Sequence, residues 1–73
     1  MNMTEDIQKY IDAFDRIIGD ASVPKNIRRR TEKMKKILSN EKEPILNRTA
    51  KIIPELEIIG NNITCSRYLG LLI

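Results

Sequence analysis

The sequence has 73 residues, with 13 basic and 10 acidic side chains and a formal net charge of +3. A chain of this length forms one domain, here residues 1–73, and buries only about 60% of its unfolded surface. It has no histidine and one cysteine, which excludes an internal disulfide, a multi-cysteine zinc site and the usual general base near neutral pH. We therefore expect no metal or other cofactor and no enzymatic activity.

The cysteine usage and the apolar segments indicate a compartment. A single cysteine, Cys65, favours a reducing environment. The N-terminus is acidic and polar, without the basic segment and apolar run of a signal peptide. The apolar runs are far shorter than the roughly 20 residues that cross a bilayer. We expect a cytoplasmic protein that has no contact with membranes.

The first predicted helix covers about residues 5–18. Its apolar side chains recur at the three- and four-residue spacing of one helix face. They are Ile7, Tyr10, Ile11, Phe14, Ile17 and Ile18. Gly19 and Asp20 follow and are typical of a helix end. This is the clearest helical pattern in the sequence.

The second predicted helix, about residues 23–39, carries most of the positive charge. Residues 25–36 contain seven of the 13 basic side chains and one acid, a formal charge of +6. Pro24 suits the first helical turn, and Ser22 is expected to cap the N-terminus. Most cations fall on the side of the helix opposite the apolar residues, which predicts one buried face and one basic face.

A third helix is predicted over about residues 44–59 and a fourth over 64–73. Pro54 lies inside the third helix and removes one backbone hydrogen bond, so we expect a kink near it. Gly70 weakens the fourth helix. The short connectors favour antiparallel neighbours. The predicted fold is therefore all-α, a small up-and-down helical bundle of three helices plus a short fourth.

The basic face of the second helix has two interpretations. It is either the solvated side of an amphipathic helix, or an electrostatic footprint for phosphates or an acidic partner. Its one-sidedness favours the footprint, and no aromatic residue interleaves with the cations to stack on single-stranded bases. The resulting hypothesis is a binding module that docks on structured RNA or the ribosome. Its candidate contacts are Lys25, Arg28, Arg29, Lys33 and Lys36.

The apolar C-terminal residues support an alternative function. A fourth helix that stops early leaves part of the groove between the first and third helices uncovered. Each large aliphatic side chain left in water forgoes about 1.5–3 kcal/mol of burial. The chain is then a protein–protein interaction subunit or a homodimer that buries this surface against a partner. Equally, Leu69 and Leu72 can close the core of the same chain. The residues concerned are Leu69, Leu71, Leu72 and Ile73.

A faint internal repeat relates the two halves of the sequence. At a spacing of 42 residues, Ile17 aligns with Ile59. At a spacing of 41, residues 17–19 align with residues 58–60, and both segments read Ile-Ile-Gly. Residue identity leaves the register open. Both registers describe a helix, a polar turn and a second helix, repeated twice.

The residues around the first connector resemble a known family. Residues 14–17 (FDRI) and 20–29 (DASVPKNIRR) are similar to the central motif of uncharacterised protein family 0147 of archaea. There an LDEI-type helix end is followed by a polar turn and a VPRNIRRAA-type helix start. In the second half, residues 48–50 (RTA) resemble its RAA, and residues 56–62 (LEIIGNN) resemble its second LDEISND.

This resemblance spans most of residues 10–64 and implies a compact four-helix, up-and-down bundle in archaeal cytoplasm. The sequence departs from the family pattern at two places. Ser66 stands where the second motif of the family has proline, and the family usually continues past the position of Ile73 through a longer final helix. The family has no established activity, so the resemblance assigns no site residues.

Overall fold

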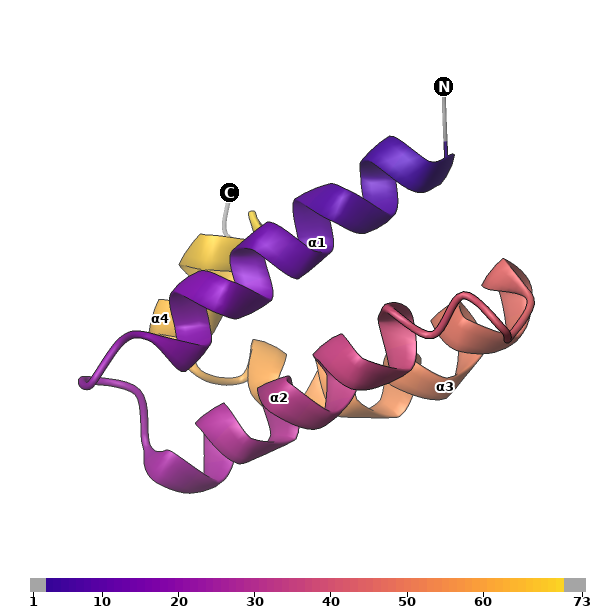
Figure 1. The fold of residues 1–73 in the computed structure, drawn as a ribbon. Helices are drawn as coiled ribbons and strands as arrows, with labels where there is room; N and C mark the ends of the chain where they lie inside the picture. Colours follow the sequence, from indigo (N-terminus) through magenta and orange to yellow (C-terminus); the bar gives the residue numbers. More distant parts are fainter. Residues whose placement is uncertain (1–2, 71–73) are drawn as a thin grey trace.

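The computed structural model describes residues 3–70, and the chain in this range is α-helical with short connectors (Figure 1). Its helices are α1 (Met3–Ile18), α2 (Lys25–Leu38), α3 (Ile45–Gly60) and α4 (Ile63–Leu69). The Cα radius of gyration is 11.7 Å, and the molecule extends over 32 × 25 × 20 Å. These dimensions fit one small domain of this length.

The helices pack in a cycle. α1 packs against α2 and α4, and α3 packs against the same two helices, so α1 and α3 lie diagonally across the bundle. Connectors of two to six residues make consecutive helices run antiparallel. This arrangement confirms the predicted up-and-down bundle of three helices plus a short fourth.

All four helices and the α1–α2 connector contribute to one hydrophobic core. Each helix turns one apolar stripe inward, as the spacing in the sequence predicts. The buried apolar side chains are Phe14, Ile17, Val23, Met34, Leu38, Ile52, Ile59 and Cys65. Thr31 is buried with them, and its hydroxyl donates a hydrogen bond to the Ile27 carbonyl at 2.9 Å. That bond satisfies a polar group which would otherwise destabilise the core.

The start of α2 differs from the prediction. Pro24 is the N-cap residue, with φ −54° and ψ 144°, and no side chain caps the helix. The expected Ser22 cap is therefore wrong. The Ser22 backbone N–H and hydroxyl both donate to the Asp20 carboxylate, at 2.8 and 2.6 Å. The Ser22 side chain therefore forms a local turn with Asp20 and does not cap the N-terminus of α2.

The start of α1 and the span of α3 also differ slightly from the predicted ranges. α1 begins at Met3 rather than near residue 5. α3 runs from Ile45 to Gly60 and continues as one helix through Pro54. The kink near this proline stays a prediction.

α4 is shorter than predicted at its C-terminal end. It begins at Ile63, where the Asn62 side chain accepts a hydrogen bond from the Cys65 N–H at 3.1 Å. It ends at Leu69 because Gly70 adopts a left-handed conformation, with φ 71°, that a right-handed helix cannot continue through. Residues 71–73, which the sequence assigned to this helix, lie outside the described residues.

The structure supports a repeat of 42 residues. Ile17 and Ile59 are both fully buried, whereas Ile58, which a spacing of 41 aligns with Ile17, is 42% exposed. Asp20 and Asn62 are also 42 residues apart, and their N–H groups donate to the carbonyls of Ile17 and Ile59 at 3.1 and 3.0 Å. The ends of α1 and α3 are therefore equivalent, although six residues separate α1 from α2 and only two separate α3 from α4.

Candidate nucleic-acid interface

Four cations line the outer face of α2. Lys25, Arg29, Lys33 and Lys36 are all exposed, and we call them the basic stripe. Their spacing places them within an arc of about 80° and along roughly 16 Å of helix axis. The opposite face of α2 is held in the core, which fixes the orientation of the stripe. The helix therefore presents a row of positive charges to solvent.

Arg28, the fifth candidate from the sequence, is placed differently. Its side chain is half-buried, and its Nε donates a hydrogen bond to the Val23 carbonyl at 3.1 Å. This contact folds the guanidinium back over the connector that precedes α2. Arg28 therefore holds the turn in place, and the structure brings only the other four candidates together.

The remaining cations of α2 form ion pairs with neighbouring helices. Arg30 contacts Glu55 of α3 at 2.9 Å, and Lys35 contacts Asp15 of α1 at 2.6 Å. Both pairs are partly exposed, so each contributes about 1 kcal/mol or less. No residue of the basic stripe takes part in an ion pair with any side chain of residues 6–70. The cations that can attract an outside anion are thus separate from those that brace the bundle.

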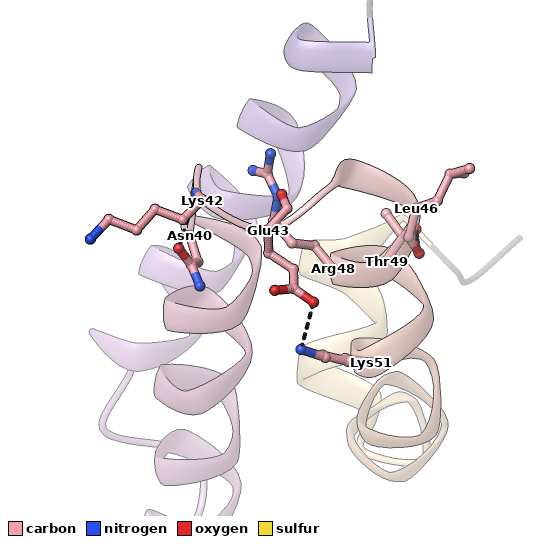
Figure 2. Close-up of polar contacts among 7 residues, drawn as sticks. All are labelled: Asn40, Lys42, Glu43, Leu46, Arg48, Thr49 and Lys51. Atoms are coloured by element: carbon pink, nitrogen blue, oxygen red, sulfur yellow. Dashed lines mark hydrogen bonds and ion pairs between the residues drawn. The ribbon is translucent and has the colours of Figure 1, made fainter.

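The connector between α2 and α3 gathers a second group of polar residues (Figure 2). The Lys51 ammonium contacts the Glu43 carboxylate at 2.9 Å. That contact keeps the pKa of Glu43 below its ordinary value. Arg48 donates from Nε to the Glu43 carbonyl at 2.8 Å and from Nη1 to the Leu38 carbonyl at 3.1 Å. Lys51, Glu43 and Arg48 thus form contacts within the α2–α3 connector and its flanking helices.

The carboxylate of Asp20 is the centre of a third polar cluster. In addition to its two bonds from Ser22, it accepts a hydrogen bond from the Tyr68 hydroxyl of α4 at 2.7 Å. The hydrogen bond from the Ser22 hydroxyl is the main reason why the pKa of Asp20 is lowered, and the bond from Tyr68 is the next largest. The bond to the Asp20 carboxylate in turn raises the pKa of Tyr68. No pattern in the sequence indicates this contact, because the two residues are 48 positions apart.

The other candidate chemistry in the described chain is sparse. Cys65 is fully buried, and its burial raises the pKa of its thiol, so it behaves as a core residue. No group of three or more potential ligands among the described side chains is arranged to hold a metal ion. None of the helices between residues 3 and 70 has the length and apolar character needed to span a bilayer.

Comparison with known proteins gives a family and two relatives. Residues 1–68 match the model of an uncharacterised protein family (UPF0147). A UPF0147 protein of Methanosarcina acetivorans is 43% identical over 58 residues, which cover 80% of this chain and 60% of the relative. A UPF0147 protein of Methanosarcina mazei is 41% identical over 59 residues, which cover 81% and 63%. The chain thus spans about 60% of the length of these curated relatives. No solved structure matches it significantly.

Proposed function

We propose that this chain, which belongs to the uncharacterised protein family UPF0147, is a non-enzymatic, cytoplasmic binding module for structured RNA, the ribosome included. The basic stripe of α2 is the contact surface. One observation carries the proposal: the four cations of the stripe are exposed and form no ion pair with residues 6–70, while Arg30 and Lys35 of the same helix are both paired.

The chemistry of the stripe fits the phosphate backbone. Four lysine and arginine side chains can displace condensed counterions, which is the main source of affinity in sequence-independent binding. No aromatic residue lies among the four, so the stripe lacks the aromatic side chains on which unpaired bases mostly stack. Double-stranded RNA is recognised mostly by its shape and its phosphates. The composition of the stripe therefore favours folded RNA over single strands.

Fluorescence anisotropy with a labelled RNA hairpin at several salt concentrations tests the proposal. If all four cations contact phosphates, the slope of log K against log salt lies between about −2.8 and −3.6. A single-stranded RNA of the same length is expected to bind more weakly at each salt concentration, because it lacks the fixed phosphate geometry.

Charge-reversal variants test whether the RNA contact lies on α2. Arg29→Glu and Lys33→Glu should each weaken hairpin binding and reduce the salt slope by roughly 1. The matched control is Arg67→Glu, which changes the net charge equally but lies on α4, a helix that does not pack against α2. Equal losses from all three variants would show that net charge alone attracts the RNA. Absence of binding at low salt would remove the proposal altogether.

A further inference from the structure

An apolar groove lies between α1 and α3. It has a volume of about 200 Å³, and Leu38 of α2 contributes to its lining. Its other lining residues are Asp6, Ile7 and Tyr10 of α1 and Ile45, Thr49, Ile52, Ile53 and Leu56 of α3. Within residues 3–70 the groove is open because α4 ends at Leu69 and lies beside the C-terminal half of α1 only (Figure 1). No helix of the described range therefore takes the fourth position beside the N-terminal half of α1.

An apolar ridge borders the groove on α3. Leu46, Ala50, Ile53 and Pro54 are all exposed and follow one another at helical spacing along the outer side of this helix. Leu46 is 74% exposed and projects away from the bundle (Figure 2), and Ile53, which also lines the groove, is 53% exposed. A protruding aliphatic side chain and an apolar hollow thus lie next to each other on one face.

The composition of this face and the dimensions of the molecule are compatible with an interface between subunits. A stable interface takes about 800 Å² from each partner, which is about 15% of the 5256 Å² surface of this chain. One broad side of a molecule that measures 32 × 25 Å can supply that area. Among the described side chains, those of residues 6–70, Asp6 and Tyr10 are the ionisable groups that line the groove, so covering it removes few of these charges from water.

We propose that two copies of this chain associate symmetrically through the α1–α3 face, with Leu46 of each copy inserted into the groove of the other. In a two-fold dimer the same surface must complement itself, and a ridge beside a hollow does so. The groove exceeds the 150 Å³ void that an aromatic-sized ligand can occupy, so one leucine side chain fits. Ala50, in the middle of the ridge, lets the two α3 helices approach closely. This dimer does not depend on RNA binding, because the basic stripe lies on a different helix face.

Analytical ultracentrifugation of the purified chain, over at least a hundredfold range of concentration, tests the dimer. The expected result is a concentration-dependent shift from monomer to dimer mass. Leu46→Glu should weaken dimerisation by about thirtyfold or more, as removal of a central anchor does. The matched control is Ile63→Glu, because Ile63 is a comparably exposed aliphatic residue, 65% exposed, that does not line the groove. It should dimerise like the unaltered chain.

Circular dichroism of both variants is the control for folding. Because Leu46 and Ile63 are so exposed, we expect both variants to keep their helices. A monomer mass at every concentration overturns the proposal, and so does equal dimerisation of the two glutamate variants. A shortened chain that ends at Gly70 tests a third possibility, in which the C-terminal residues of the same chain occupy the groove. If the unaltered chain is monomeric and this shortened chain melts at a lower, concentration-independent temperature, the groove belongs to the chain's own C-terminal residues and the dimer is wrong.

Discussion

The two long connectors have the same backbone but different attachments. We call residues 20–24 turn 1 and residues 40–44 turn 2. Each begins with Asp or Asn, whose side chain accepts the N–H of the second residue after it, at 2.8 Å in turn 1 and 3.1 Å in turn 2. Each ends in a proline N-cap, with φ −54° and ψ 144° at Pro24 and φ −55° and ψ 144° at Pro44.

An arginine four residues after each proline completes the shared design. Arg28 donates from Nε to the Val23 carbonyl, and Arg48 donates from Nε to the Glu43 carbonyl, at 3.1 and 2.8 Å. In both turns the arginine reaches back from the first turn of the following helix. Three positions, each 20 residues apart in the sequence, therefore recur in both turns: Asp20 and Asn40, Pro24 and Pro44, and Arg28 and Arg48.

The two turns are attached to different parts of the fold. In turn 1, Asp20 binds Tyr68 of α4. In turn 2, Glu43 binds Lys51, and Arg48 also donates to the last carbonyl of α2, at Leu38. Turn 1 thus connects the first half of the chain to α4, whereas the side-chain bonds of turn 2, within the part of the chain that the structure describes, reach its own flanking helices. Asp20 and Arg48 therefore have two roles each: they hold the backbone of their own turn and attach it to a neighbouring helix.

The largest expected difference between the turns is at the two arginines. Arg48→Ala removes two hydrogen bonds from a charged donor and should lower the free energy of unfolding by about 2 kcal/mol. Arg28→Ala removes one such bond and should cost about 1 kcal/mol. Urea unfolding of both variants measures the two losses.

Arg48→Lys is the control for this comparison. It retains the positive charge near the C-terminus of α2 but cannot reach two carbonyls with the planar fork of arginine. It should therefore behave more like Arg48→Ala than like the unaltered chain. A larger loss at Arg28 than at Arg48 would mean that the second bond, to Leu38, contributes nothing.

Exchanging Asp and Asn at the first residue of each turn is expected to change the stability less than the arginine variants do, and to destabilise only turn 1. Asp20→Asn retains the turn but replaces a charged acceptor of the Tyr68 hydroxyl by a neutral one, so the chain should be less stable near neutral pH. Asn40→Asp keeps its acceptor and should change stability by about 0.5 kcal/mol or less. Thermal melts of the two variants under one buffer measure both. Tyr68→Phe should reproduce the loss at Asp20 if the tyrosine is the reason for it.

The sequence predicted the helices well because their stability comes from regular apolar stripes such as Ile7, Ile11 and Phe14. The predicted N-cap at Ser22 was wrong. A serine shortly before the first turn of a helix is an ordinary cap, but here the Asp20 carboxylate accepts the hydrogen bonds of this serine. The shared turn was recognisable in principle: Pro24 and Pro44 are 20 residues apart. The apolar residues, in contrast, repeat at a spacing of 41 or 42 residues.

The candidate interface was predictable only in part. Residues Lys25, Arg29, Lys33 and Lys36 follow from helical geometry alone. That Arg28 turns back onto a backbone carbonyl depends on the shape of the connector, which no periodicity describes. The α1–α3 groove was expected from a short fourth helix, but the protruding Leu46 beside it was not.

The smallest expected effect distinguishes the two carboxylates that the turns hold. The pKa of Asp20 lies below its ordinary value of 3.8, chiefly because the Ser22 hydroxyl donates to it, and the pKa of Glu43 lies below 4.5, chiefly because Lys51 does. A lowered pKa stabilises the folded chain above the ordinary value, and this stabilisation is lost as the pH falls through the folded value. Both turns should therefore weaken only under acidic conditions, below about pH 4.5.

The two carboxylates should respond differently to salt and to mutation. An exposed ion pair is screened by added salt, whereas hydrogen bonds from neutral hydroxyls are affected much less. In NMR titrations of the side-chain carboxyl carbons, we expect salt to raise the pKa of Glu43 more than that of Asp20. Ser22→Ala should raise the pKa of Asp20 alone, and Lys51→Met that of Glu43 alone. If salt shifts both carboxyls equally, then turn 1 is held by the general positive field of α2, with Arg28 beside it, and the hydroxyl contacts are not what sets the acidity of Asp20.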